Sequence, residues 1–197
     1  DETYDVLIAG GGVAGVAAAL AAARAGTRTA LIDKGILLGG LATAGLVNIY
    51  LPLCDGNGRQ VTFGIAEELL HASLRYGPGA VPADWPRGRD AAEGHRYRAV
   101  FAPAAFALAL DELVEQAGVA LWLDTLVAGV RRDGDAVAGL EVETKAGRGL
   151  LRGRVCIDAT GDADLAARAG AACEAGRNKL ALWALGAVGP GAPDPRP

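Results

Sequence analysis

The chain of 197 residues has few of the side chains that build metal centres and disulfide frameworks. It contains only two histidines and three cysteines. Cys54, Cys156 and Cys173 lie far apart and lack the short spacings of a zinc site. The sequence therefore predicts no metal site and no disulfide framework, and we expect a reducing, cytoplasmic location.

The sequence also lacks a strong excess of either charge and a long apolar run. Nineteen basic and 23 acidic residues give a net charge of −4, so no positive field favours nucleic acid or an anionic membrane surface. The apolar run 13–23 is well short of the ~20 residues of a membrane span. We therefore expect no nucleic-acid partner and no membrane partner. Methionine is absent, so we expect that residue 1 is not the translation start.

Hydrophobic residues make up 51% of the chain, which is ample for a packed core. Residues 6–9 are apolar and β-branched and predict a strand buried on both faces. Residues 13–25 predict a helix capped by Gly26, and residues 29–32 predict a second buried strand ending at Asp33. A strand, a helix and a strand of this length predict a βαβ unit.

The middle of the chain interrupts the regular alternation of strands and helices. It begins with an irregular, glycine-rich segment, where a doubly wound fold would continue with a helix. The pattern then predicts a helix over 63–75, a long loop or lid over 76–96, a strand over 97–101, a helix over 103–116 and a third buried parallel strand over 119–123.

The last third predicts an antiparallel three-stranded meander over 126–130, 136–144 and 149–158. The joints "RDGD" and "KAGR" carry the glycine signals of tight hairpins. A short helix over 163–168 follows. The sequence as a whole predicts an α/β fold: a Rossmann-like βαβ domain with a parallel central sheet plus this meander.

Gly10, Gly12 and Gly15 form a GxGxxG motif between the first strand and the first helix. The first glycine permits a tight turn, the second lets backbone approach a pyrophosphate, and the third lets helix and strand pack closely. The phosphates would contact free amides at Val13 and Ala14, where the helix dipole favours negative charge.

Asp33 lies at the tip of the second strand, where an acid in such units accepts hydrogen bonds from a ribose. Its charge disfavours the 2′-phosphate of NADP. A purely structural interpretation, in which the glycines cap a helix and Asp33 begins a turn, needs no ligand. FAD and NAD both carry adenosine diphosphate, so the glycines do not separate them, but the meander favours FAD over a classical NAD-dependent dehydrogenase domain.

Four segments carry a family resemblance, which extends to about Trp183. They are "YDVLIAGGGVAGVAAALAAARAG", "LIDKGILLGGLATAGLV", "LPLCDGNGRQVTFGIAEELL" and "VCIDATGDADLAARAGA". The chain resembles the FAD-dependent oxidoreductases of the glutathione-reductase-like superfamily, in which "ATGD" after a meander is a second fingerprint. The pairing of both motifs is more specific than either one.

The resemblance implies a set of FAD-contacting positions. Several have alternatives that need no cofactor: Gly39 and Gly40 as a bend in a surface loop, Val127 as core, and Thr160 with Asp162 as helix caps. The implied contacts are Gly10, Gly12, Val13, Ala14 and Gly15 to the pyrophosphate, Asp33 and Lys34 to the ribose, Gly40, Leu41, Ala42 and Thr43 beside phosphates and flavin, Val127 to adenine through its main chain, and Ala159, Thr160, Gly161 and Asp162 beside the first glycine loop.

The resemblance also implies a function and a domain division. Residues 1–176 would form the FAD-binding domain with the lid or insert 76–96, and residues 177–197 an incomplete continuation with a Pro/Gly-rich tail. We expect hydride transfer from an unidentified small organic substrate to the flavin. The alternatives are a non-catalytic FAD-binding module, or a truncated subunit completed by a partner chain. A homo-oligomer or a missing C-terminal portion fits the short length.

Two further features each have a functional and a structural interpretation. Cys54 follows the predicted flavin loop and is either a thiol that meets substrate or a small buried apolar residue. Arg87, Arg89, Arg96 and Arg98 either clamp an anionic substrate or form a solvated basic loop. The sequence alone identifies no catalytic residue.

Overall fold

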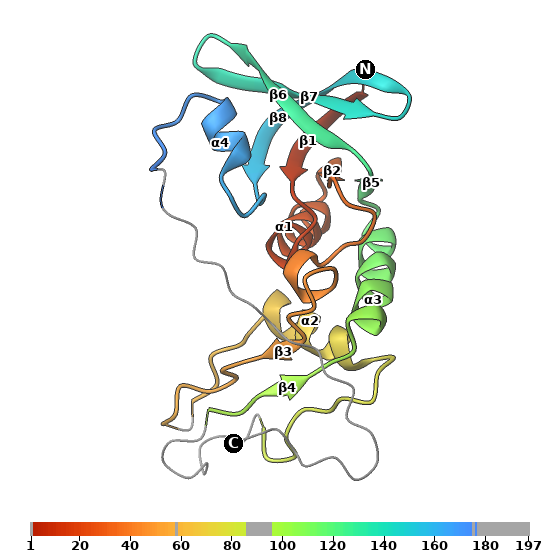
Figure 1. The fold of residues 1–197 in the computed structure, drawn as a ribbon, viewed down its shortest axis with the longest axis vertical. Helices are drawn as coiled ribbons and strands as arrows, with labels where there is room; N and C mark the ends of the chain where they lie inside the picture. The colour runs from red at the N-terminus through yellow and green to blue at the C-terminus, as the bar shows by residue number, and fades with distance from the viewer. Residues whose placement is uncertain (1, 58, 86–95, 175, 177–197) are drawn as a thin grey trace.

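The computed structural model describes residues 2–57, 59–85, 96–174 and 176. Its centre is a six-stranded sheet in the order β5-β2-β1-β8-β7-β6 (Figure 1). The first four strands run parallel, and β7 and β6 continue the sheet antiparallel. The strands are β1 (Glu2–Ala9), β2 (Thr29–Ile32), β5 (Ala120–Trp122), β6 (Leu126–Asp133), β7 (Ala136–Thr144) and β8 (Gly147–Asp158).

The predicted βαβ unit is confirmed. Helix α1 (Val13–Arg24) connects β1 to β2, which pair in parallel from Val6 with Thr29 to Ala9 with Ile32. The alanine-rich sequence of α1 favours a helix, and all four residues of β2 are buried, as its continuous apolar run predicts.

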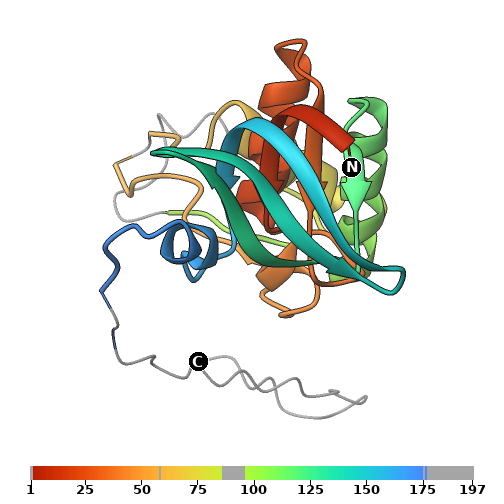
Figure 2. The same cartoon turned by 90° about the horizontal axis from the view of Figure 1, so that it is seen from above.

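The predicted meander is confirmed, and it is not a separate sheet. Strand β8 pairs antiparallel with β7 and also parallel with β1, from Glu2 with Leu151 to Ala9 with Asp158. Gly134 lies in the first hairpin turn and Gly147 opens β8 directly after the second, and both have positive φ, as the glycine signals predict. Seen from above, the meander curves over one end of the molecule (Figure 2). The parallel part of the sheet and the meander therefore share one strand, β8.

The predicted strand over 119–123 is parallel, but its predicted burial is wrong. β5 is the edge strand of the sheet, so one side has no neighbouring strand, and Leu121 is 37% exposed. The strand predicted over 97–101 shortens to β4 (Ala99–Val100), because Tyr97 adopts a left-handed backbone with φ 52°. β4 pairs with β3 (Ile49–Tyr50) in a two-stranded ribbon.

Helices α2 (Ile65–Leu74) and α3 (Pro103–Gln116) lie near the bounds that the sequence predicts and pack with α1. The largest hydrophobic core includes residues of all three helices, β1 and β2, and the ring of Phe106 is central to it. In Figure 1 the β3–β4 ribbon and the meander lie at opposite ends of the molecule. The remaining elements are the 3₁₀ helix η1 (Gly40–Ala42) and α4 (Asp164–Arg168). No helix of the described ranges has both the length and the apolar character to cross a bilayer.

We predict that Phe106→Ala lowers the free energy of unfolding by about 3–5 kcal/mol. The Phe106 ring is fully buried and packs edge-on against Phe101 at 5.2 Å and Tyr50 at 6.4 Å between centroids. Urea denaturation monitored by circular dichroism measures the loss. Leu108→Ala, on the same helix but at a side chain 51% exposed, is the control and should stay within about 0.5 kcal/mol of the parent. Equal losses in both variants would contradict this core.

Candidate functional site

The glycine loop between β1 and α1 is packed against two backbone segments. A Cβ on Gly10, which has φ 104°, would lie 2.3 Å from the carbonyl oxygen of Ala159. A Cβ on Gly15 would lie 1.8 Å from the carbonyl oxygen of Gly10. These separations are impossible for any residue with a side chain, so the close helix–strand packing predicted for Gly15 is present.

Gly12 differs because it faces open space. Its backbone is extended, with φ −64° and ψ 176°, and a Cβ there would meet no atom within 4 Å. It is the N-cap of α1, and no described side chain caps this helix start or places an acid in its first turn. The first amides of a helix lack intrahelical partners, and the helix dipole is positive at this end. The loop therefore offers a free anion-binding surface.

Asp33 connects the end of β2 to the glycine loop. Its Oδ2 accepts a hydrogen bond from the Gly11 amide at 2.5 Å, and its Oδ1 accepts one from the Gly35 amide at 2.6 Å. Each carboxylate oxygen can accept a second hydrogen bond, so the group retains capacity for ligand hydroxyls. Asp33 thus fixes the loop and still has acceptor capacity towards the cleft that it lines.

Gly39 and Gly40 lie directly against the glycine loop between β1 and α1. Gly39 donates its amide to the Gly11 carbonyl at 2.8 Å, and a Cβ on Gly40 would lie 3.1 Å from the Cα of Gly12. Gly39 and Gly40 both have positive φ and open the 3₁₀ helix η1. The two segments, 27 positions apart between Gly12 and Gly39, form a bridge pair. A bend in a surface loop does not explain this contact.

These segments surround an open, mainly apolar cleft with a volume of about 940 Å³. Asp33 and Lys34 line it, and so do Tyr50 and Phe101 from the β3–β4 ribbon. A smaller cavity of about 50 Å³, lined by Thr125, Leu126 and Val127, adjoins the cleft and shares Gly10, Asp33, Lys34 and Thr160 with it.

The structure brings most of the predicted site residues to these two cavities. Val127 lines the smaller one and also packs against the core, so both of its interpretations stand. Three predicted residues do not line either cavity: Gly15, Asp162 and Thr43, whose buried hydroxyl donates to the Leu38 carbonyl at 2.5 Å. Those in the cleft are Gly10, Gly12, Val13, Ala14, Asp33, Lys34, Gly40, Leu41, Ala42, Ala159, Thr160 and Gly161.

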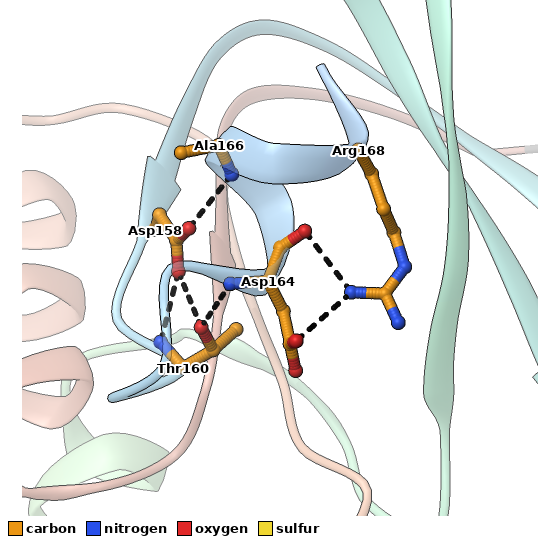
Figure 3. Close-up of polar contacts among 5 residues, drawn as sticks. All are labelled: Asp158, Thr160, Asp164, Ala166 and Arg168. Atoms are coloured by element: carbon orange, nitrogen blue, oxygen red, sulfur yellow. Dashed lines mark hydrogen bonds and ion pairs between the residues drawn. The ribbon is translucent and has the colours of Figure 1, made fainter. Parts of the chain in front are cut away.

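The turn after β8 is organised by Asp158 (Figure 3). Its Oδ1 accepts hydrogen bonds from the Thr160 amide at 3.0 Å and hydroxyl at 2.7 Å, and its Oδ2 accepts one from the Ala166 amide at 2.8 Å. The Thr160 hydroxyl in turn accepts the Asp164 amide at 3.0 Å. The capping interpretation is therefore right for Thr160 and wrong for Asp162, which is exposed and gives α4 no side-chain cap.

Several lining residues escaped the sequence analysis. The cleft is also lined by Ile36, Leu37, Tyr50 and Phe101, none of which belongs to a recognised sequence motif. Tyr50 and Phe101 are far apart in the sequence and are brought together at the β3–β4 ribbon. Asp158 immediately precedes "ATGD", and that adjacency was the available signal.

Cys54 is fully buried, and burial raises its pKa, so the interpretation as a small apolar residue is confirmed. Residues 86–95 of the predicted lid, with Arg87 and Arg89, and residues 177–197 lie outside the described residues.

A sequence profile of the family described as "FAD dependent oxidoreductase" matches residues 5–182. No curated protein sequence matches the chain. Solved structures with the same fold include a geranylgeranyl bacteriochlorophyll reductase-like protein from Thermoplasma acidophilum, 25% identical with a TM-score of 0.56, the match covering 86% of this chain and 42% of that one.

Two further similar structures support the fold alone. They are p-nitrophenol 4-monooxygenase from Pseudomonas putida (18% identity, TM-score 0.56, 86% of this chain and 43% of that one) and glycine oxidase from Geobacillus kaustophilus (20% identity, TM-score 0.53, 86% and 59%). The chain spans less than two thirds of the length of each of these three proteins.

We predict that Asp158 makes the stability of the domain depend on acid pH. Burial alone would raise the pKa of Asp158, but the hydrogen bonds from Ala166 and Thr160 outweigh it and lower the pKa below its ordinary value of 3.8. A lowered pKa contributes stability that is complete above the ordinary value and is lost as the pH falls through the folded-state value.

Urea denaturation between about pH 6 and pH 3 tests this contribution. Asp158→Asn should lower the free energy of unfolding at neutral pH by about 1–3 kcal/mol and reduce its decrease on acidification. Asp162→Asn, at an exposed carboxylate four residues further along the chain, should leave both quantities unchanged. An unchanged acid slope in the Asp158→Asn variant would contradict the network.

Proposed function

Because the chain belongs to the FAD-dependent oxidoreductase family, whose cofactor is FAD, we propose that residues 1–176 are its FAD-binding domain. One observation carries this proposal: the free helix start at Gly12, the Asp33 carboxylate and the Gly40 backbone converge on one cleft. The paired motifs at Gly10 and Ala159 further favour the glutathione-reductase-like group within the flavoproteins.

The residues present fit FAD along the whole cleft. The amides at Val13 and Ala14 would bind the pyrophosphate, because Gly12 leaves room for it. Asp33 would accept the adenosine ribose hydroxyls, and the cavity beside Val127 would take the adenine edge. Tyr50 and Phe101, at the β3–β4 ribbon, would flank the flavin with apolar rings.

We propose that the complete protein oxidises a small organic substrate by hydride transfer to this cofactor. When bound, FAD supplies the hydride acceptor, and the protein supplies position, electrostatics and exclusion of water. Asp33 makes the adenosine end unfavourable for a 2′-phosphate, which disfavours NADP.

Two other functions remain as alternatives to be tested. One is an FAD-binding module without turnover, or a subunit completed by a partner chain or a further C-terminal portion, which the partial coverage of the similar structures favours. The other is an NAD-binding dehydrogenase domain, which the meander disfavours. We further propose a cytoplasmic protein, on the basis of the scattered cysteines, with no nucleic-acid or membrane partner.

We predict that the purified chain retains FAD, with absorption bands at about 370 and 450 nm that the flavin ring gives. Gly12→Val should abolish this retention while leaving the unfolding midpoint unchanged, because its side chain enters the space expected for the pyrophosphate, and a Cβ there meets no protein atom within 4 Å. Gly149→Val, at an exposed strand glycine distant from the cleft, is the matched control and should retain FAD.

Retention of FAD by Gly12→Val would refute the phosphate site. A colourless chain that binds NADH in a fluorescence titration would instead support the dehydrogenase alternative. Anaerobic addition of a library of organic acids, alcohols and amines then separates an enzyme from a module, since reduction of the flavin bleaches the band at about 450 nm.

A further inference from the structure

A second pocket begins where the cofactor cleft ends. Tyr50 and Phe101 line the cleft, and the next residues of the ribbon, Leu51 and Pro52 after β3 and Arg98 before β4, line a pocket of about 360 Å³. Tyr50 pairs with Ala99, so the two sides of this pocket are adjacent across the ribbon. Since a strand rises about 3.3 Å per residue, the pocket lies within roughly 10 Å of the end of the cleft.

The pocket contains two arginines, Arg96 and Arg98. Arg96 and Arg98 are exposed, and no ion pair joins either to a carboxylate of the described ranges. Elsewhere in those ranges a carboxylate oxygen lies within 4.0 Å of Arg24, Arg28, Arg75, Arg131, Arg132, Arg148, Arg154 and Arg168. Within the described residues, neither arginine of this pocket is neutralised by an ion pair.

The backbone that carries these arginines is held firmly. The Arg96 carbonyl accepts the amides of Leu53 at 2.9 Å and Cys54 at 2.8 Å. Between the arginines, Tyr97 has the left-handed φ of 52°, which is strained for a residue with a side chain, and its hydroxyl donates to Asp84 at 2.5 Å. Tyr97 and the arginines on either side of it all line the same pocket. This strained and hydrogen-bonded backbone disfavours the interpretation of Arg96 and Arg98 as part of a solvated basic loop.

We propose that this pocket is the substrate site, and that Arg96 and Arg98 bind the anionic head group of a small organic acid or phosphate ester. Leu51 and Pro52 would contact the apolar body of that molecule, because they form the rest of the pocket with Tyr97. The oxidisable carbon would then point along the ribbon towards Tyr50 and the flavin end of the cleft. The assignment as a substrate site rests on the proposed function, whereas anion binding does not.

Calorimetric titration of the FAD-loaded chain tests the anion site, with benzoate and phenyl phosphate as the probes and benzyl alcohol as the neutral analogue. We expect saturable binding of at least one anion and at least tenfold weaker binding of benzyl alcohol. The double variant Arg96→Gln, Arg98→Gln should weaken the anion tenfold or more, as loss of charge-assisted hydrogen bonds does. Arg59→Gln, at an exposed arginine outside the pocket, should change the affinity less than twofold.

The flavin absorbance of the same samples separates this proposal from the proposed function. A chain that retains FAD but binds neither anion, or whose double variant binds them as tightly as the parent, overturns the anion site and leaves the cofactor assignment intact. A chain that binds an anion through these arginines but retains no FAD refutes the cofactor assignment. Preference for benzoate or for phenyl phosphate identifies the head group.

Discussion

The whole site depends on the absence of side chains where β1 ends. Gly15 of helix α1 packs directly against the Gly10 carbonyl, and the Cα of Gly10 faces the Ala159 carbonyl. Three backbone segments are therefore in direct contact, with no side chain between them. Any side chain at Gly10 or Gly15 would separate helix α1 from the ends of β1 and β8. The contact places the positive start of the helix beside two strand ends, which is the position at which open α/β sheets bind ligands.

Backbone hydrogen bonds then complete a cradle around this contact. Asp33 and Gly39 bind the amide and the carbonyl of Gly11, one from each flanking segment, so both polar groups of this peptide are engaged. Gly12 is left facing the cleft, together with Val13 and Ala14 at the helix start. The loop is thus held in its binding conformation by the protein itself, which reduces the entropy lost when a ligand binds.

Local sequence patterns predicted the helices and strands well. Features that depend on contacts between residues distant in the sequence could not be predicted in this way. The bounds of α3 and of the βαβ unit follow from Pro103, from the alanines and from the β-branched runs, which act over a few neighbours. The exposure of β5 was missed because strand order decides which strand lies at an edge. Tyr50 reaches the cleft through pairing with Ala99, nearly fifty residues away, and no local signal carries that information. The hydrogen bond from the Ala166 amide to Asp158 likewise joins residues eight positions apart, so the role of Asp158 in the turn follows from the fold and not from its neighbours in the sequence.

Strand β8 has its alignment set twice. Leu151 faces Glu2 on one side and Leu140 on the other, and Arg152 faces Thr3 and Gly139. A residue inserted or deleted between these positions and Asp158 would disrupt the pairing of β8 with β1 or with β7. A one-residue shift of register turns every following side chain to the opposite face of the sheet. The hairpin tips, at Gly134 and at residues 145–146, bear no such double constraint. During divergence of related sequences, changes in length should therefore accumulate at those tips, while the spacing from Leu151 to Asp158 stays fixed.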